Sequence, residues 1–304
     1  MWSTEDIIDQ SGKTVIITGS NSGIGFETAK ALYEKGAHVI LACRDMVKAQ
    51  SAIAEIQKQP KSGKLEAARL DLSSLSSVSR FAHEFKEKGI PLHLLINNAG
   101  IMNPPLSYTT EGYESQYGVN FLGHFALTAH LYPLLAQNEG ARIVTVTSLA
   151  YTYGSIDFDN LKSEKSFDAF REYCQSKLSN LIFSIELQRR ITTRGDQILS
   201  VAAHPGVTKT DLSRHMSAEE LSSFAERLGP SMEVQQGALS ILYAAVSPNV
   251  VGGAFYGPDT DGGLRGYPAS TLIAEVAMDE ILAKRLWKSA QTTCELYLPA
   301  RLQI

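Results

Sequence analysis

Tyr173 and Lys177 are the pair in this sequence best suited to acid–base chemistry. They stand four positions apart in a stretch with helical periodicity, so their side chains share one face of the helix. An ammonium group beside a phenol favours the phenolate and lowers a pKa that is ordinarily about 10. Such a pair can exchange a proton with a substrate oxygen at neutral pH. The spacing alone is a weak signal, because Tyr-x-x-x-Lys pairs are common on helix surfaces.

Ser148 offers a hydroxyl group for the same chemistry. It directly follows the apolar run 142–147, which we expect to be a strand. Open α/β sheets bind their ligands at the carboxyl ends of their strands. The sequence therefore predicts that Ser148 hydrogen-bonds the oxygen with which Tyr173 exchanges its proton.

A glycine-rich turn, Thr18-Gly-Ser-Asn-Ser-Gly-Ile-Gly25, follows the first apolar run. Its glycine spacing allows a tight turn, a close approach of the backbone to a diphosphate, and packing of the next helix on the strand. The N-terminus of that helix offers free N–H groups to phosphate. A turn without a ligand is the alternative, but the strand–turn–helix context favours a nucleotide. The predicted contacts are Gly19, Ser20, Asn21, Ser22, Gly23, Ile24 and Gly25.

The second predicted strand ends in Arg44-Asp45, at the place where a dinucleotide-binding fold selects NAD or NADP. The Arg44 guanidinium can pair with a 2′-phosphate. Asp45 lies near the usual position of an acid that selects NAD, and its alternative role is to cap the next helix. We expect NADP(H) as the cofactor, with NAD(H) as the weaker candidate.

These residues need a framework in which strands and helices alternate. Short apolar runs predict seven strands, and apolar positions repeating at i, i+3, i+4 and i+7 predict the helices between them. Buried parallel strands separated by amphipathic helices imply a sheet covered on both faces. The expected fold is α/β, a single doubly wound Rossmann-type domain over residues 1–304 with a seven-stranded parallel sheet flanked by helices. The strands are expected at 14–18, 37–43, 65–70, 92–96, 142–147, 198–202 and 253–256.

Two long irregular stretches, 151–166 and 205–230, are where we expect function to concentrate. A substrate loop or lid is expected at about 205–232. Its apolar residues either cover an apolar substrate or belong to the core of an ordinary helix; they are Met216, Leu221, Phe224 and Leu228. A C-terminal extension, about 268–304, is expected to hold a helix followed by an irregular tail. The apolar face of that helix is predicted from Ile273, Val276, Ala277 and Ile281.

Composition excludes several classes of protein. The chain has 304 residues, of which 44% are apolar and 20% charged, and this suits a folded protein with a large core. A net charge of −4 argues against a dedicated nucleic-acid-binding protein. The apolar runs are too short for a signal peptide or a membrane anchor, so we expect a cytoplasmic protein. Cys43, Cys174 and Cys294 indicate reduced thiols, and no metal site is expected from the residue spacing.

Motifs along most of the chain resemble those of the short-chain dehydrogenase/reductase family. In order, they are Thr18-Gly19-x3-Gly23-x-Gly25, Asn97-Asn98-Ala99-Gly100, Asn120, Ser148, Tyr173-Cys-Gln-Ser-Lys177 and Pro205-Gly206. The resemblance spans Gly12 to about Pro258, and this order and spacing are very specific. It implies an oxidoreductase that moves hydride between a nicotinamide and a carbonyl or alcohol group, with Tyr173 as the general acid/base.

The same resemblance implies roles for other residues. Ser148 would orient the substrate oxygen, Lys177 would hold the nicotinamide ribose, and Asn120 would fix a water that relays the proton. The remaining cofactor contacts that it implies are Asp71, Leu72, Asn98, Ala99, Gly100, Tyr173, Lys177, Pro205 and Gly206.

Within the family, several segments are similar to the retinol-dehydrogenase-like subgroup, which favours NADP(H). They are Ala42-Cys-Arg-Asp45, the long spacing from Ser148 to Tyr173, and Arg285-Leu-Trp287. Members that act on retinoids often carry a membrane anchor, which we do not expect here. The expected substrate is a hydrophobic ketone, aldehyde or alcohol. Relatives commonly pair through two long helices, so a homodimer or homotetramer is compatible, and the C-terminal extension would either cap that surface or add to it.

Other residues receive no functional role. We interpret His124 and His130 as structural, His204 as a hydrogen-bonded core histidine, and Cys174 as buried packing. One rival hypothesis is a regulatory or scaffold protein that binds the cofactor without turnover. Its expected mark is damage among the four catalytic candidates, and all four are intact: Asn120, Ser148, Tyr173 and Lys177. A second rival is an enzyme that reduces an activated C=C bond, or epimerises, on the same scaffold.

Overall fold

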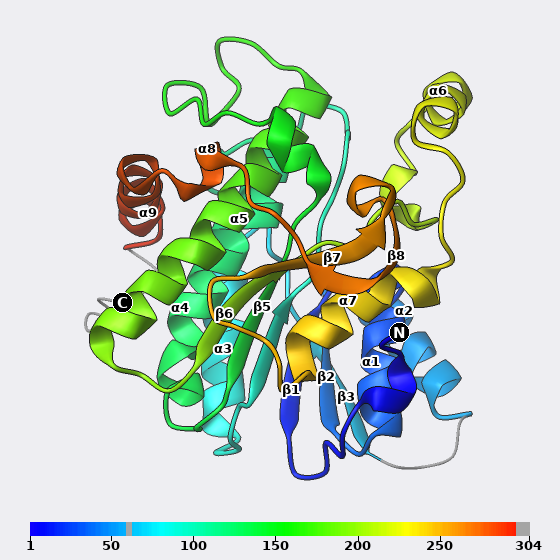
Figure 1. The fold of residues 1–304 in the computed structure, drawn as a ribbon. Coiled ribbons are helices and arrows are strands. Elements are labelled where there is room, and N and C mark those ends of the chain that lie inside the picture. The colour runs from blue at the N-terminus through cyan, green and yellow to red at the C-terminus, as the bar shows by residue number, and fades with distance from the viewer. Residues whose placement is uncertain (59–62, 296–304) are drawn as a thin grey trace.

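The computed structural model describes residues 1–58 and 63–295, and one mixed sheet lies at its centre (Figure 1). The strands are β1 Thr14–Thr18, β2 His38–Cys43, β3 Lys64–Arg69, β4 Leu94–Asn97, β5 Arg142–Val146, β6 Leu199–Ala203, β7 Phe255–Thr260 and β8 Arg265–Ser270. Their order across the sheet is β3-β2-β1-β4-β5-β6-β7-β8. Neighbouring strands are parallel, except that β7 and β8 are antiparallel.

Helices cover both faces of the sheet (Figure 1). They are α1 Gly23–Glu34, α2 Met46–Ile56, α3 Leu75–Glu87, α4 Gly123–Leu135, α5 Ala169–Arg194, α6 Ala218–Leu228, α7 Val234–Val246, α8 Glu275–Met278 and α9 Glu280–Cys294. Helices α3, α4 and α5 lie on one face, and α1, α2 and α7 lie on the other. A π-helical turn, Tyr117–Leu122, leads directly into α4.

Alternate residues of each strand enter two separate cores. In β1, Ile16 packs with α3, α4 and α5, while Val15 and Ile17 pack with α1, α2 and α7. All three side chains are fully buried, as expected for a strand covered on both faces. The seven strands predicted from the sequence are all present within a few residues of their expected bounds. The doubly wound α/β fold is therefore confirmed.

The sheet has an eighth strand, β8, that the sequence pattern does not predict. It pairs antiparallel with β7 at the edge of the sheet and is half-buried along most of its length. Gly266 and Pro268 interrupt its apolar pattern, and both residues are tolerated on an edge strand. The expectation of seven parallel strands is corrected to eight strands, the last of them antiparallel.

The chain after β8 folds back against α5 (Figure 1). The single helix expected around 273–281 is divided, because Asp279 caps a new helix by accepting hydrogen bonds from Ile281 N (2.8 Å) and Leu282 N (3.0 Å). Ile281 is 82% exposed, so its predicted place on the apolar face is wrong. The buried face of α9 consists of Ala283, Leu286, Trp287, Ala290 and Cys294. The tail expected after residue 295 lies outside the described residues.

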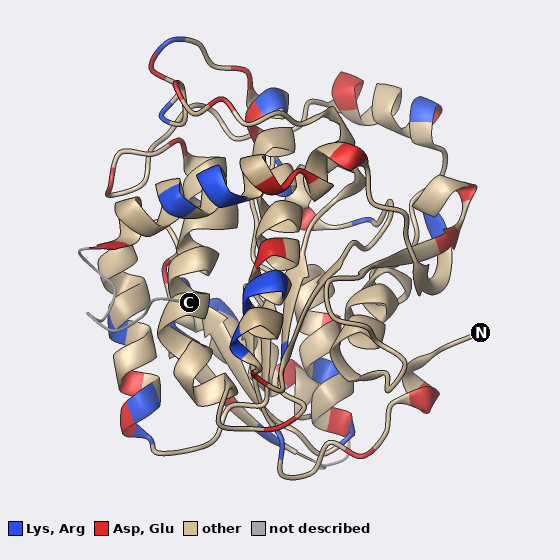
Figure 2. Cartoon of the chain, turned by 60° about the vertical axis from the view of Figure 1, so that its left-hand side comes forward, with Lys and Arg blue, Asp and Glu red and all other residues tan. Residues whose placement is uncertain are grey.

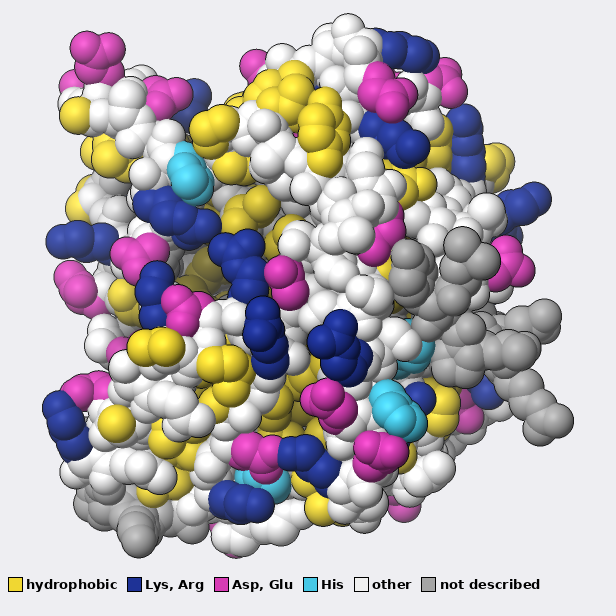
Figure 3. Space-filling view, turned by 180° about the vertical axis from the view of Figure 1, so that it is seen from behind, with side chains coloured by type: hydrophobic (Ala, Val, Ile, Leu, Met, Phe, Trp, Pro, Cys, Tyr) yellow, Lys and Arg dark blue, Asp and Glu magenta, His cyan; other side chains and the backbone are white. Residues whose placement is uncertain are grey.

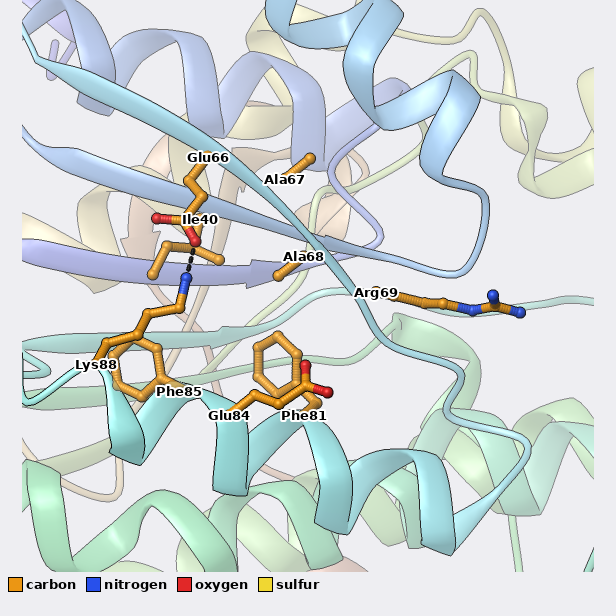
Figure 4. A pocket seen from close by; sticks show the side chains of 9 residues that line it. All are labelled: Ile40, Glu66, Ala67, Ala68, Arg69, Phe81, Glu84, Phe85 and Lys88. Atoms are coloured by element: carbon orange, nitrogen blue, oxygen red, sulfur yellow. Dashed lines mark hydrogen bonds and ion pairs between the residues drawn. The ribbon is translucent and has the colours of Figure 1, made fainter.

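Acidic and basic residues are interspersed over the helices and loops (Figure 2). None of the described helices is both long and apolar enough to cross a membrane. A hollow of about 200 Å³ lies between β3 and α3, with an ion pair between Lys88 and Glu66 at its side (Figure 4). The nine residues that line this hollow include none of the site residues predicted from the sequence.

Candidate active site

The carboxyl ends of four neighbouring strands form the candidate site. β1 leads into the glycine turn at Gly19, β4 leads to Asn98, β5 to Ser148 and β6 to Pro205. These four strands are adjacent and parallel, so their carboxyl ends meet along one edge of the sheet. This is the edge at which open α/β sheets bind ligands.

The glycine turn requires its glycines. Gly19 and Gly23 have φ angles of 63° and 59°, in the left-handed region that favours glycine. A Cβ on Gly19 would stand 2.9 Å from Ala99 Cβ, and one on Gly25 would stand 2.5 Å from Asn98 Nδ2. The segment after β4 therefore packs directly on the turn, and no larger residue fits at positions 19 and 25.

The turn leaves polar groups open at the start of α1. Ser22 is exposed, and within residues 1–58 its side chain caps none of the first N–H groups of this helix. Those N–H groups and the Ser22 hydroxyl are free to bind an anion. The Ser20 hydroxyl is not free to bind an anion, because it is buried and donates a hydrogen bond to Ile17 O at 2.9 Å. Asn21 is half-buried, and Ile24 packs into the core.

Arg44 and Asp45 have different environments at the end of β2. Asp45 is the N-cap of α2, and its Oδ1 accepts hydrogen bonds from Val47 N (3.0 Å) and Lys48 N (3.1 Å). This is the capping role that the sequence offers as the alternative to selection of NAD. Arg44 is exposed, which leaves its guanidinium open to an anionic ligand.

Asp71 and Leu72 follow β3. Asp71 is half-buried, and its Oδ1 accepts hydrogen bonds from Ser73 N (3.0 Å) and Ser73 Oγ (2.6 Å). Leu72 is buried against α4, since a Cβ on Gly123 would stand 2.6 Å from Leu72 O. A ligand contact at Leu72 would therefore come from its backbone, because its side chain belongs to the core.

The side chain of Asn98 is used to hold the glycine turn. Asn98 Nδ2 donates to Thr18 O at 2.8 Å, and the backbone N–H groups of Asn98 and Ala99 both donate to Thr18 Oγ1 at 2.9 Å. Thr18 thus joins β1 to the segment after β4. These bonds place the backbone of this segment, rather than the Asn98 amide, toward a ligand in the turn.

Tyr173 and Lys177 lie on α5 and are each only 3% exposed. Lys177 Nζ is 5.7 Å from the centroid of the Tyr173 ring and donates to Val146 O at 3.3 Å. The Ser148 side chain lies near enough to the Tyr173 phenol to act on its pKa. A Cβ on Gly100 would stand 3.4 Å from Lys177 Nζ. Side chains from α5 and from the end of β5 therefore meet beside the segment that packs on the glycine turn.

Burial governs the pKa values of this pair. It raises the pKa of Tyr173, against the lowering effect of the nearby Ser148 side chain, and it lowers the pKa of Lys177 to about 8. The expectation of a lowered Tyr173 pKa is therefore not met in this structure, because burial sets its direction. At neutral pH the phenol keeps its proton.

Asn120 lies in the π-helical turn and is fully buried. Its Nδ2 donates to Ile101 O (3.0 Å) and to Ser176 Oγ (2.9 Å), and its Oδ1 accepts from Ile101 N (2.9 Å). Ser176 Oγ in turn donates to Tyr173 O at 2.8 Å. The Asn120 amide thus ties the loop after β4 to the helix that carries Tyr173.

Ser176 and Ile101 are partners of Asn120 that the sequence pattern does not single out. Ser176 lies three positions after Tyr173, and this spacing on a helix indicates a contact between the two. Ile101 contributes only backbone atoms, so its residue type carries no such signal.

Pro205 and Gly206 begin a loop that returns toward the glycine turn. Thr210 lies in this loop, and its side chain is 3.8 Å from the place where a Cβ on Gly23 would stand. His204 is buried, and its Nδ1 accepts a hydrogen bond from Gly206 N at 3.3 Å. The interpretation of His204 as a hydrogen-bonded core histidine agrees with this geometry.

Helix α6, in the same loop, projects from the body of the molecule (Figure 1). None of its residues is buried, so the hypothesis that its apolar residues form ordinary core is wrong. Arg265 of β8 holds its C-terminal end by donating to Leu228 O and, at 2.7 Å, to Pro230 O. From behind, basic side chains lie beside a hollow with an apolar floor, below the projecting segment (Figure 3).

Known proteins match most of the chain, including the segments that carry the candidate site. A family model for short chain dehydrogenase matches residues 13–221, which include the glycine turn, Asn120, Ser148, Tyr173 and Lys177. The chain belongs to the short-chain dehydrogenase family. It is 38% identical to human retinol dehydrogenase 12 over 94% of this chain and 86% of the relative. It is 37% identical to mouse polyprenol dehydrogenase over 91% of this chain and 82% of the relative.

Solved structures share the fold. An uncharacterized protein from Mycobacterium paratuberculosis is 37% identical, with a TM-score of 0.81 over 97% of each chain. RhlG from Pseudomonas aeruginosa, solved as a complex with NADP, is 24% identical, with a TM-score of 0.64 over 82% of this chain and 95% of RhlG. The similarity to RhlG shows the fold alone, while the curated relatives place this short-chain dehydrogenase among retinol-dehydrogenase-like proteins.

Proposed function

We propose that this short-chain dehydrogenase is an NADP(H)-dependent enzyme that transfers hydride between nicotinamide and a carbonyl or alcohol group. The observation that carries the proposal is the meeting of Ser148, Tyr173 and Lys177 beside Gly100, whose segment packs on the glycine turn. The nicotinamide, when bound, supplies the hydride for carbonyl reduction or accepts it in alcohol oxidation.

Tyr173 is the proposed general acid. Burial raises its pKa, so the phenol keeps its proton until a substrate oxygen with developing negative charge takes it. Ser148 would hydrogen-bond the same oxygen and stabilise that charge. Lys177 would hold the nicotinamide ribose. Asn120 Oδ1 accepts one hydrogen bond in the structure and lies beside Gly100, so it can also hold the water that resupplies the proton.

The residues along the sheet edge fit NADP. The glycine turn and the open start of α1 form a cradle for the diphosphate, and the Ser22 hydroxyl lies at its rim. Arg44 would bind the 2′-phosphate, because Asp45 is engaged as a helix cap and the guanidinium is exposed. The remaining proposed cofactor contacts are Gly19, Ser20, Asn21, Gly23, Ile24, Gly25, Asp71, Leu72, Asn98, Ala99, Gly100, Tyr173, Lys177, Pro205 and Gly206.

The proposed substrate is an apolar aldehyde, ketone or alcohol. Apolar residues of α6 stay exposed, with Leu221 at 40%, and the loop 205–232 could close them over a substrate as a lid. Tyr153 and Phe170, also exposed, contact each other with 6.3 Å between ring centroids. Phe170 lies three positions before Tyr173 on α5. The names of relatives, retinol and polyprenol dehydrogenases, point to the same substrate class.

The test is an assay of the full chain with NADPH or NADH and a panel of apolar aldehydes, ketones and enones. We expect consumption of NADPH with carbonyl substrates. Consumption of NADPH with the enones alone would instead indicate an enzyme that reduces C=C bonds. Tight binding of NADPH without turnover of any panel member would favour a cofactor-binding protein that is not an enzyme.

We also propose that the chain does not pair through α4 and α5. Trp287 of α9 lies against Phe125 of α4 and Phe183 of α5, with ring centroids 5.0 and 5.8 Å apart. Helix α9 therefore covers part of α4 and α5, the long helices through which pairing is expected from the family resemblance. We expect light scattering to give a mass near 33.1 kDa, that of one chain. A dimer that persists when charged residues are introduced on α9 would indicate that two chains pair through a surface that does not include α9.

A further inference from the structure

His124 is a buried histidine that contacts a residue of the proposed reaction. It follows Asn120 by four positions and is 1% exposed. Its Nδ1 lies 2.9 Å from Asn120 O, and its Nε2 lies 2.8 Å from Thr18 Oγ1. The ring therefore bridges the π-helical turn and the last residue of β1, immediately before the glycine turn.

The hydrogen bonds of Thr18 decide which ring nitrogen carries the proton. Thr18 Oγ1 accepts from the backbone N–H groups of Asn98 and Ala99, each at 2.9 Å. A hydroxyl oxygen has two acceptor lone pairs, and these two bonds use both of them. The Thr18 hydroxyl can therefore make a further hydrogen bond only by donating its own hydrogen. His124 Nε2, at 2.8 Å, is a much nearer acceptor for that hydrogen than Ile96 O at 3.5 Å. His124 Nε2 therefore accepts this hydrogen bond.

The role of the other nitrogen follows from this assignment. A neutral imidazole without a proton on Nε2 carries it on Nδ1, so His124 Nδ1 donates to Asn120 O. An imidazolium does not fit, because its Nε2–H would point at a Thr18 oxygen whose lone pairs are both used. Burial agrees with this, since it lowers the pKa of His124 to about 4, and the charge of Lys177 acts in the same direction.

We propose that His124 is a positioning residue for the reaction, which holds the Asn120 peptide in place and joins it to the Thr18 hydroxyl. The proposal rests on the proposed role of Asn120. Because the Asn120 amide ties Ile101 to Ser176, a displaced Asn120 peptide would shift the groups next to Tyr173 and Lys177. His124 acts through Asn120, and it is not proposed to touch substrate or cofactor.

Loss of the imidazole should affect the two sides of the bridge unequally. Without it, Thr18 Oγ1 still accepts from Asn98 N and Ala99 N, and its hydrogen can turn to Ile96 O. The Asn120 carbonyl loses its hydrogen bond to the ring, which lies at 2.9 Å. We therefore expect kcat to fall while the KM for NADPH stays nearly constant.

Three variants of the full chain test this expectation. His124→Phe removes both hydrogen bonds and should lower kcat about tenfold to a hundredfold, with KM for NADPH changed less than about threefold. His124→Asn puts an amide N–H near the place of Nδ1 and should recover most of kcat. His130→Phe is the matched control, because His130 is also buried on α4 but lies six residues farther from Asn120. It should leave kcat unchanged.

A second measurement does not depend on turnover. Nitrogen NMR of the wild-type chain, with the His124 signals assigned by their absence in His124→Asn, should show the Nδ1–H tautomer and no titration through neutral pH. An Nε2–H tautomer would overturn the proposal, as would wild-type kcat in His124→Phe or equal losses in the Phe and Asn variants. Absence of turnover in the wild-type protein would refute the proposed function, while the tautomer would still decide whether His124 bridges as described.

Discussion

Tyr173 and Lys177 differ from free side chains because the fold removes both from water. Burial raises the pKa of Tyr173 and lowers that of Lys177 to about 8, so at neutral pH the phenol holds its proton. A phenol that holds its proton suits the donation of that proton to a carbonyl oxygen during reduction. At the residue scale, this protonation state supports the proposed role of Tyr173 as the acid in carbonyl reduction.

The Tyr173 hydroxyl should be essential for turnover but not for binding. Tyr173→Phe is expected to lower kcat for carbonyl reduction by about 10²- to 10⁴-fold, because it removes the proton donor and keeps the ring. The Kd for NADPH, measured by fluorescence titration, should stay the same. Tyr132→Phe removes another buried hydroxyl, one that donates to Asp196, and should keep kcat. Retention of more than about a tenth of wild-type kcat by Tyr173→Phe would exclude its role as the acid.

Arg44 should distinguish the two cofactors. Arg44→Ala is expected to raise KM for NADPH about tenfold to a hundredfold, because a charged hydrogen bond to the 2′-phosphate is lost. KM for NADH should hardly change, since NADH lacks that phosphate. Lys48→Ala, which removes a neighbouring exposed cation, is the control. Equal effects of Arg44→Ala on both cofactors would contradict its proposed role.

Residue types and spacing predicted which side chains meet, but not the environment in which they meet. Tyr173 and Lys177 share a helix face because of their spacing, yet the direction of the Tyr173 pKa depends on burial by distant parts of the chain. The sequence position of Asp45 alone allows two roles, selection of NAD and capping of α2. Its bonds to Val47 N and Lys48 N support the capping role. The partners of Asn120 depend on contacts between elements, which spacing does not reveal.

At the element scale, the loop that carries α6 stands on a fixed base. Val207 N donates to Leu264 O (2.9 Å), and Met232 N donates to Val207 O (2.8 Å). Arg265 holds the other end of α6 through Leu228 O and Pro230 O. Helix α6, which lies between these anchors, has no buried residue, as a lid that closes on a substrate would require.

Loosening this base should weaken substrate binding. Arg265→Ala is expected to raise KM for an apolar aldehyde about threefold to tenfold, because it removes the hydrogen bonds that set the end of α6. The Kd for NADPH should be unchanged. Arg227→Ala, on the exposed surface of α6 itself, serves as the control in steady-state assays. An unchanged substrate KM in Arg265→Ala would argue against a lid anchored at this point.

Helix α9 should contribute strongly to stability. Trp287 is 5% exposed, stacks on Phe183, meets Phe125 edge to face, and lies 4.1 Å below the Arg190 guanidinium. Trp287→Ala is expected to lower the free energy of unfolding by about 3–5 kcal/mol in denaturant titrations. Lys288→Ala, at the exposed neighbouring position, should change it by less than about 0.5 kcal/mol. Similar values for both variants would show that α9 is not firmly packed.

The elements that the sequence did not predict well lie at the end of the chain. β8 is an edge strand that contains Gly266 and Pro268, so it lacks the continuous apolar pattern of the inner strands. Asp279 ends α8 and starts α9, and this shift moves Ile281 from the predicted apolar face into solvent. The inner strands were predictable because burial on both faces demands apolar residues throughout.

At the scale of the whole molecule, two buried histidines link stability to pH. Burial lowers the pKa of His124 and of His204 to about 4, from an ordinary value of 6.5. Between these pH values the unfolded chain binds protons that the folded chain does not. The free energy of unfolding should therefore be highest above about pH 6.5 and fall toward pH 4, by at most about 3 kcal/mol for each histidine.

Denaturant titrations at a series of pH values measure this fall. His83→Ala is the control, since the His83 side chain is 72% exposed and its loss should leave the pH dependence unchanged. A free energy of unfolding that stays constant from neutral pH to about pH 5 would contradict the neutral, buried state of both rings.

The fold joins two halves of one site, a glycine turn on β1 and the hydroxyl and ammonium groups of β5 and α5, through the segment that ends at Gly100. The most direct test of this account follows deuterium from C4 of labelled NADPH in the presence of an apolar aldehyde. We expect wild-type protein to place the deuterium on the carbinol carbon of the alcohol, and Tyr173→Phe to bind NADPH equally well but transfer almost none. Transfer at the wild-type rate by Tyr173→Phe, or no transfer by the wild-type protein to any carbonyl, would contradict it.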